Sequence, residues 1–168
     1  MSSETFTTAI FLITAIVAAA ILVNAFFPVI YSATSTFTES SHSSDERLRT
    51  DLKIVNAYTA SDGSTKVWIK NIGSMRVGDT AISSSDVYFG IPGNFNYMLY
   101  TPGVTPASGQ WTFSIRESTA TPNEYWDSGE TLEITLKVDA STFSSGEYAY
   151  FQFVLPNGVS VSTQYTVS

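Results

Sequence analysis

The residues of this sequence best suited to chemistry are five carboxylates that lie in or beside its turns: Asp79, Asp86, Glu124, Asp127 and Glu130. Carboxylates and turn carbonyls are the ligands that calcium takes in proteins. The alternative is that these side chains are simply solvated in loops, and we favour it. Two of the acids could also pair for hydrolysis, but nothing in the sequence pairs them. We therefore expect no metal, no cofactor and no catalytic set.

The groups that most other enzymes use are also missing. The chain has no cysteine, which excludes disulfides, thiolate zinc sites and thiol nucleophiles. Its single histidine, His42, lies in a serine-rich stretch where we expect it to be solvated, so histidine-dependent triads are absent. The stretch "GIPGNFN" lacks the lysine of a phosphate loop. The eight basic residues form no patch, so we expect no nucleic-acid partner and no enzyme.

The N-terminal stretch is apolar and carries no charge between Glu4 and Glu39. From Ala9 to Phe27 every residue but two is apolar, and about 20 such residues span a bilayer as a helix. A cleaved signal fits poorly, because "MSSETFTT" contains no basic residue. We predict that residues 1–31 form a hydrophobic helix that spans a membrane or packs in the core of a filament.

Contact with membrane lipid or with identical helices is assigned to seven side chains: Ala9, Phe11, Ile13, Ala15, Ala19, Leu22 and Phe26. Ala15 and Ala19 have the spacing that lets two helices approach closely. We expect Pro28 to bend the helix or to end it. Glu4 is a candidate assembly charge, since a carboxylate near the N-terminus can meet a neighbour's terminal amine at low dielectric. The alternative is that Glu4 lies in the aqueous interface.

Residues 32–51 are rich in Ser and Thr and then carry mixed charges, so we expect a stalk that is partly helical. Residues 44–50 are predicted to be helical, because Ser44 or Asp45 can cap the first free N–H groups. The conformation of residues 32–41 stays open between a flexible linker and a helix.

From Leu52 onward the hydrophobic period changes to two, which is typical of strands. "TLEITLKV" alternates strictly, and "YAYFQFVL" is apolar on both faces, so we expect the latter to be a central strand. Residues 61–64 and 156–158 are hairpin candidates, and residues 100–110 should form an exposed loop. We predict that residues 52–168 fold as an Ig-like antiparallel β-sandwich, so that the chain is α+β in outline.

Several aromatic residues could form a binding face on this sandwich, although for most of them the core is the better assignment. They are Tyr88, Tyr97, Tyr100, Trp111 and Tyr125.

The order of these segments resembles that of a known family. "TAIFLITAIVAAAILVNAFFPVIYS…DERLRTDLKIVNAY" resembles the archaeal flagellar (archaellum) accessory proteins FlaG and FlaF, and "KVWIKNIGSMRVGD…DVYFG" resembles the sandwich that they share with archaellins. The resemblance implies an archaellum motility protein of archaea, anchored in the cytoplasmic membrane with its sandwich outside at the cell surface. It implies a stator part that binds the S-layer, another envelope protein or its own kind as a homo-oligomer. The positive-inside rule, applied to Arg47, Arg49 and Lys53 after the apolar run, would weakly favour a C-terminal domain inside the cell. The orientation that the resemblance implies overrides it.

The alternative is an archaellin or type IV pilin-like subunit of an extracellular filament, whose N-terminal helices bundle into the core. Such subunits carry a basic leader that is cut before the apolar helix, and "MSSETFTT" shows none. The sequence also has no Asn-x-Ser/Thr sequon, whereas exposed filament subunits are often glycosylated. A third hypothesis, of a different class, is a surface-anchored module that binds carbohydrate or calcium.

Overall fold

The structure is a computed structural model that describes residues 2–117 and 123–167. The chain divides into two compact units, residues 1–44 and residues 45–168. Among the described residues, the first unit is helical throughout, and the second contains the last turn of that helix together with the strands.

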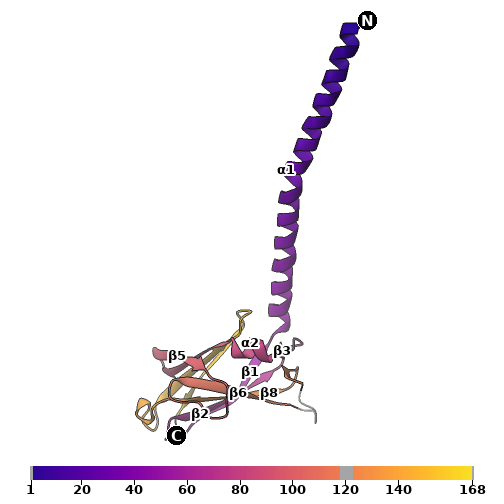
Figure 1. Cartoon of the computed structure of the whole chain (residues 1–168). Helices are drawn as coiled ribbons and strands as arrows, with labels where there is room; N and C mark the ends of the chain where they lie inside the picture. Colours follow the sequence, from indigo (N-terminus) through magenta and orange to yellow (C-terminus); the bar gives the residue numbers. More distant parts are fainter. Residues whose placement is uncertain (1, 118–122, 168) are drawn as a thin grey trace. The chain divides into compact units, whose positions relative to one another are not determined.

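A single helix, α1 (Ser2–Arg49), forms the N-terminal part of the chain (Figure 1). The stretch 32–41, which the sequence left open, is helical, and the helix predicted over residues 44–50 ends at Arg49. Hydroxyl groups in this polar half donate to the carbonyls one turn earlier, as Thr34 does to Ile30 (2.9 Å) and Thr36 to Ser32 (2.9 Å). These bonds satisfy the hydroxyls inside the helix, which lets a run of Ser and Thr stay helical.

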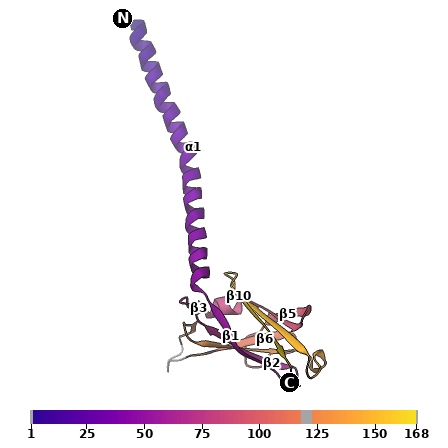
Figure 2. The same ribbon diagram turned by 180° about the vertical axis from the view of Figure 1, so that it is seen from behind.

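The helix continues through Pro28 and changes direction near its middle (Figures 1 and 2). Proline has no N–H to donate to the carbonyl of Asn24, and its ring pushes against that carbonyl, so the helix bends there. Figures 1 and 2 show the predicted bend, and the alternative that Pro28 ends the helix is wrong, because α1 continues to Arg49.

Short strands and two small helical segments make up the second unit. They are β1 (Leu52–Thr59), β2 (Ser64–Asn71), β3 (Val77–Gly78), α2 (Asp79–Ser83), β4 (Asp86–Ile91), β5 (Asn94–Tyr100), β6 (Gln110–Arg116), β7 (Tyr125–Trp126), β8 (Thr131–Lys137), η1 (Ala140–Thr142), β9 (Tyr148–Val154) and β10 (Ser160–Thr166). Eight of the strands form a sheet in the order β1-β2-β8-β6-β5-β4-β9-β10, and β3 pairs with β7.

The large sheet folds into the two layers of a sandwich, with β1-β2-β8-β6 in one layer and β5-β4-β9-β10 in the other (Figure 2). Strand β5 joins the layers, because its residues 94–98 pair with β4 and its last two, Leu99 and Tyr100, pair with β6. That last pairing is parallel, so the predicted sandwich is confirmed but is not antiparallel throughout. A hydrogen bond of 2.7 Å between Thr59 Oγ1 and the Tyr165 hydroxyl links the two outermost strands, β1 and β10.

The predicted turns and the central strand are confirmed. Residues 61–64 close the β1–β2 hairpin and residues 156–158 close the β9–β10 hairpin. Strand β9 lies between β4 and β10, as its apolar faces predicted. The predicted loop over residues 100–110 is mostly exposed. Its first residue, Tyr100, belongs to β5 and its last, Gln110, belongs to β6.

Alternating side chains of both layers meet in the core between them, which explains the period of two in the sequence. Trp111 is fully buried there beside Phe153, with the ring centroids 6.3 Å apart. Of the other aromatic residues considered above, Tyr88 and Tyr100 are half-buried, whereas Tyr97 and Tyr125 are exposed. The core assignment is therefore right for Trp111 and wrong for the two exposed tyrosines.

Candidate assembly site

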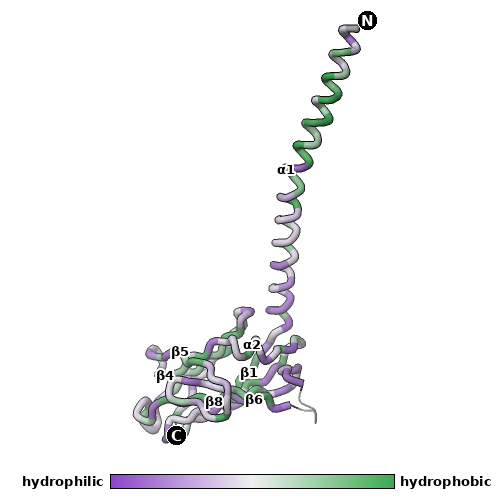
Figure 3. Tube along the Cα trace, viewed as in Figure 1, coloured by the Kyte–Doolittle hydropathy of each residue, from purple (hydrophilic) through white to green (hydrophobic). Residues whose placement is uncertain are grey.

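The apolar half of α1 is exposed all the way round. Ala9 to Phe27 is 19 residues, or about 29 Å of helix, which matches the roughly 30 Å hydrocarbon core of a bilayer. Phe11 in this segment is 77% exposed, and Figure 3 shows the change from hydrophobic to hydrophilic residues along the helix. Among the described residues, α1 is a helix long and apolar enough to cross a membrane. Such a surface needs a cover, which is either lipid or protein.

All seven residues predicted for this contact lie on α1 and are exposed. Most of them share one face, because residues three or four apart lie on the same side of a helix. The members of this face are Phe11, Ala15, Ala19, Leu22 and Phe26. Ala9 and Ile13 fall on the opposite side. The structure therefore divides the predicted set into a seam and two residues outside it.

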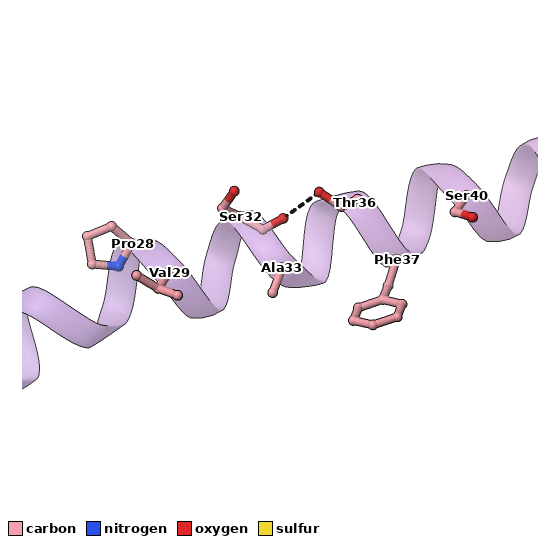
Figure 4. A pocket seen from close by; sticks show the side chains of 7 residues that line it. All are labelled: Pro28, Val29, Ser32, Ala33, Thr36, Phe37 and Ser40. Carbon is pink, nitrogen blue, oxygen red and sulfur yellow. Dashed lines mark hydrogen bonds between the residues drawn. The ribbon is translucent and has the colours of Figure 1, made fainter.

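The seam continues past Pro28, where the sequence interpretation stopped. With the same spacing of three or four it runs through Val29, Ala33, Phe37 and Ser40. These four side chains line a shallow groove on the helix together with Pro28, Ser32 and Thr36, and Ala33 and Phe37 point to the same side (Figure 4). Continued spacing beyond Phe26 is the signal that could have found them. The seam thus leaves the apolar half and enters the Ser/Thr-rich half.

The seam mixes large and small side chains. Ala33 lies between Phe26 and Phe37, and Ser40 follows Phe37. Spacing that alternates between four and three residues is the pattern by which helices pack side by side. Phe37 is an aromatic residue in a polar stretch of the helix, and its side chain is 75% exposed. A lipid-facing anchor gives no reason for this aromatic side chain in the polar half, whereas a packed helix pair does.

Glu4 lies in the first turn of α1 and is exposed. A carboxylate there suits the positive end of the helix dipole as well as a neighbour's amine. Its assembly role stays a prediction.

The five carboxylates considered for calcium do not form a site. Within residues 2–117 and 123–167 no group of three or more His, Cys, Asp or Glu side chains could hold a metal ion. Asp127 and Glu130 share a turn, in which the Asp127 N–H donates to the Glu130 carboxylate (3.0 Å). Asp127 also pairs with Arg76 at 3.1 Å. These contacts shape the turn.

A different carboxylate, Glu133, is the strongly held one. It lies on the outer face of β8, yet its side chain is only 8% exposed. Lys66 Nζ donates to it at 2.8 Å, Trp68 Nε1 at 3.1 Å, and Arg116 through two nitrogens at 3.0 and 2.7 Å. Burial alone would raise the pKa of Glu133, but the bonds from Lys66, Arg116 and Trp68 outweigh it and hold the pKa at about 2. The network fastens β2, β8 and β6 together.

Sequence reasoning missed Glu133 as a buried group, because the alternation of "TLEITLKV" correctly puts it on the wet face. Its cover comes from β2 and β6, which are far away in the sequence. The Glu133 carboxylate at the centre of the network is covered and fully paired, so we assign the network to stability.

Comparison with known proteins gives the chain its relatives. The family model of archaeal-type flagellins matches residues 2–165. An uncharacterised protein of Archaeoglobus fulgidus is 30% identical over 164 residues, which is 95% of each chain.

Solved structures with the same fold are structural parts of the archaellum. The periplasmic stator protein FlaG of Sulfolobus acidocaldarius is 26% identical, with a TM-score of 0.55 over 69% of this chain and 99% of that chain. The FlaF–FlaG stator complex of the same organism is 25% identical, with a TM-score of 0.54 over 68% and 87%. The match to the archaeal flagellum of Methanospirillum hungatei covers 97% of this chain and 93% of that chain, with a TM-score of 0.68. At 14% identity that likeness concerns the fold alone.

Proposed function

Because the chain belongs to the archaeal-type flagellin family, we propose that it is a non-enzymatic structural subunit of the archaellum, of the FlaG and FlaF stator kind. Its apolar helix anchors it in the cytoplasmic membrane, and its sandwich stands at the cell surface and binds the S-layer, another envelope protein or its own kind.

The observation that carries this proposal is the match to FlaG. FlaG is 26% identical to this chain, whereas the archaeal flagellum structure is 14% identical. The match extends over 99% of the FlaG chain. A fold shared at that identity and coverage supports a shared place in the machine. The neighbouring structure that contains FlaF with FlaG supports association between sandwiches of this type.

The helix adds an assembly role to the anchor. The seam from Phe11 to Ser40 runs through both the apolar and the polar half of α1. We propose that identical helices pack along it, with Phe37 seated between small residues of a neighbour, while the remaining apolar surface faces lipid. Interfaces between membrane helices are rich in small residues that let the backbones approach closely.

A second candidate is a filament subunit. The family model, which describes flagellins, and the full-length likeness to a filament structure favour it. In that case neighbouring helices cover the whole apolar surface and no lipid remains.

Cell fractionation separates the two candidates. Filaments sheared from cells should contain this chain only in trace amounts if it is a stator part, and the chain should stay with the envelope fraction. If mass spectrometry finds it as a major protein of the sheared filaments, the stator proposal is wrong and the filament subunit takes its place.

The helix seam has its own test. Phe37→Glu places a charge on the seam, and Thr38→Glu places the same charge on the opposite side of α1 as a matched control. After detergent removal, electron microscopy and light scattering should show that Phe37→Glu assembles poorly and that Thr38→Glu assembles like the natural chain. Equal behaviour of the two variants contradicts packing along the seam.

A further inference from the structure

We infer that the outer face of β5, β4, β9 and β10 is an interface between two copies of this chain. The inference rests on the proposed function, because it describes how the sandwiches meet once the helices bring them together. It follows from the aromatic residues of this face, from its lack of charge and from its area.

Five aromatic side chains share this face, here called the aromatic face: Tyr88, Phe95, Tyr97, Tyr148 and Tyr150. Strand register places them together, because residues paired across neighbouring strands point to the same side. Tyr88 pairs with Tyr97 in β5, and Gly90 pairs with both Phe95 and Tyr150. Ring centroids lie 5.8 Å apart for Tyr88 and Tyr97, 6.2 Å for Tyr88 and Phe95, and 4.9 Å for Phe95 and Tyr150.

Gly90 makes this cluster continuous. A Cβ at Gly90 would lie 2.7 Å from both the Asn94 carbonyl oxygen and the Phe95 Cα. Its absence lets the rings of Phe95 and Tyr150, which flank Gly90 on the two neighbouring strands, meet across it. The cluster is therefore built into the sheet, but it stays open to solvent, with Tyr97 52% and Tyr148 61% exposed.

The aromatic face is almost free of charge. Residues 148–167, which contain β9 and β10, include no Asp, Glu, Lys or Arg, and β5 has none. Asp86, at the start of β4, is the charged residue in these four strands. The outer face of the other layer is different and carries Lys66, Arg116 and Glu133. Aromatic enrichment with depletion of charge marks the centre of a protein interface.

The tilt of the rings argues for a protein partner. A sugar stacks on a flat aromatic platform, whereas Tyr88 meets Phe95 and Tyr97 at interplanar angles of 80° and 65°. Such rings form ridges and hollows that suit interdigitating side chains.

A second copy is the partner that the proposed helix packing brings nearby, and charge restricts where the two copies can meet. Each chain has a formal net charge of -7, so two copies repel each other over most of their surfaces. The aromatic face is the surface on which they can meet while placing the fewest like charges together. A two-fold axis through its centre would set Gln152, which pairs with Tyr88 in the neighbouring strand β4, near its own copy.

The area of the face sets the strength of this contact. Four strands about 4.8 Å apart and six or seven residues long cover roughly 450 Å², which is about half of the 800 Å² per partner in a stable complex. We therefore expect separate chains to associate weakly through this face. Helices packed along the seam raise the effective concentration of the sandwiches, and the contact then forms.

Cysteine cross-linking tests this, and it is clean because the natural chain has no cysteine. Gln152→Cys places a thiol at the centre of the aromatic face, and Lys70→Cys places one on the outer face of the other layer as the control. The full-length chain is treated with a short bismaleimide, once dispersed in detergent and once reconstituted in lipid. We expect at least a fivefold higher dimer yield in lipid for Gln152→Cys and no such rise for Lys70→Cys.

A charge in the face gives a second readout. Ser162 is exposed and pairs with Gln152 in β9, so Ser162→Glu should leave the sandwich folded, as tryptophan fluorescence would show. In the Gln152→Cys background it should lower the dimer yield in lipid to that of Lys70→Cys. If assembly still depends on Phe37 but Gln152→Cys cross-links no better than Lys70→Cys, the inference is overturned and the proposed function stands. If no variant assembles in lipid at all, both fail.

Discussion

Replacing Glu133 by glutamine removes the charge from a carboxylate that is almost buried between three donors. Breaking a fully buried ion pair costs about 3–5 kcal/mol, and losing an exposed pair costs about 0–1 kcal/mol. Glu133 lies between these limits, because its own side chain is covered while Lys66 and Arg116 can turn to water. We expect Glu133→Gln to lower the free energy of unfolding by about 2 kcal/mol, or roughly 6–10 °C in Tm for a domain of this size.

Urea unfolding of the full-length chain in detergent, followed by tryptophan fluorescence, measures this change. All three tryptophans lie in the sandwich, so the signal reports that unit and not the helix. Asp62→Asn is the matched control, since Asp62 forms an exposed pair with Lys137 (3.2 Å) and asparagine keeps the acceptor for the Ser64 N–H. The control should leave the midpoint almost unchanged. Equal midpoints for Glu133→Gln and the natural chain would refute our account of the network.

Three further predictions concern acid, the end of the helix and its middle. The folded-state pKa of Glu133 is about 2 against an ordinary 4.5, so the ionised carboxylate stabilises the fold fully above pH 4.5 and this stabilisation is lost as the pH falls toward 2. The natural chain should therefore lose more stability in that window than Glu133→Gln. Urea midpoints that fall in parallel for the two proteins would contradict this. Gly73→Ala should cost about 1–3 kcal/mol, because a Cβ there collides with the Arg49 carbonyl oxygen at the end of α1; an unchanged urea midpoint would show that the junction relaxes. Pro28→Ala restores a donor to the Asn24 carbonyl and a residue about 3 kcal/mol better in helices, so hydrogen exchange in the middle of α1 should slow, and unchanged exchange would argue against a strained bend.

The sequence by itself determined the elements whose cause is local. The charge-free run from Ala9 to Phe27 forms an apolar helix whose surface needs lipid or protein around it. Composition and length alone determine this. Alternation and turn residues located β8, β9 and the two hairpins, since a strand needs a period of two and a hairpin needs its turn. The spacing that extends the seam to Ser40 is also present in the sequence. It was not predicted, because the Ser/Thr-rich composition left the conformation of residues 32–41 open, and the structure shows that they are helical.

Only the tertiary structure decided which strands lie together. Lys66 and Glu133 are 67 residues apart and meet because β2 pairs with β8, and no local pattern specifies that pairing. Phe95 and Tyr150 meet across Gly90 for the same reason. Alternation tells which side of a strand a residue takes, but burial and contact on that side depend on neighbours supplied by other strands. The buried carboxylate and the aromatic face are therefore properties of the sheet order and not of any single segment.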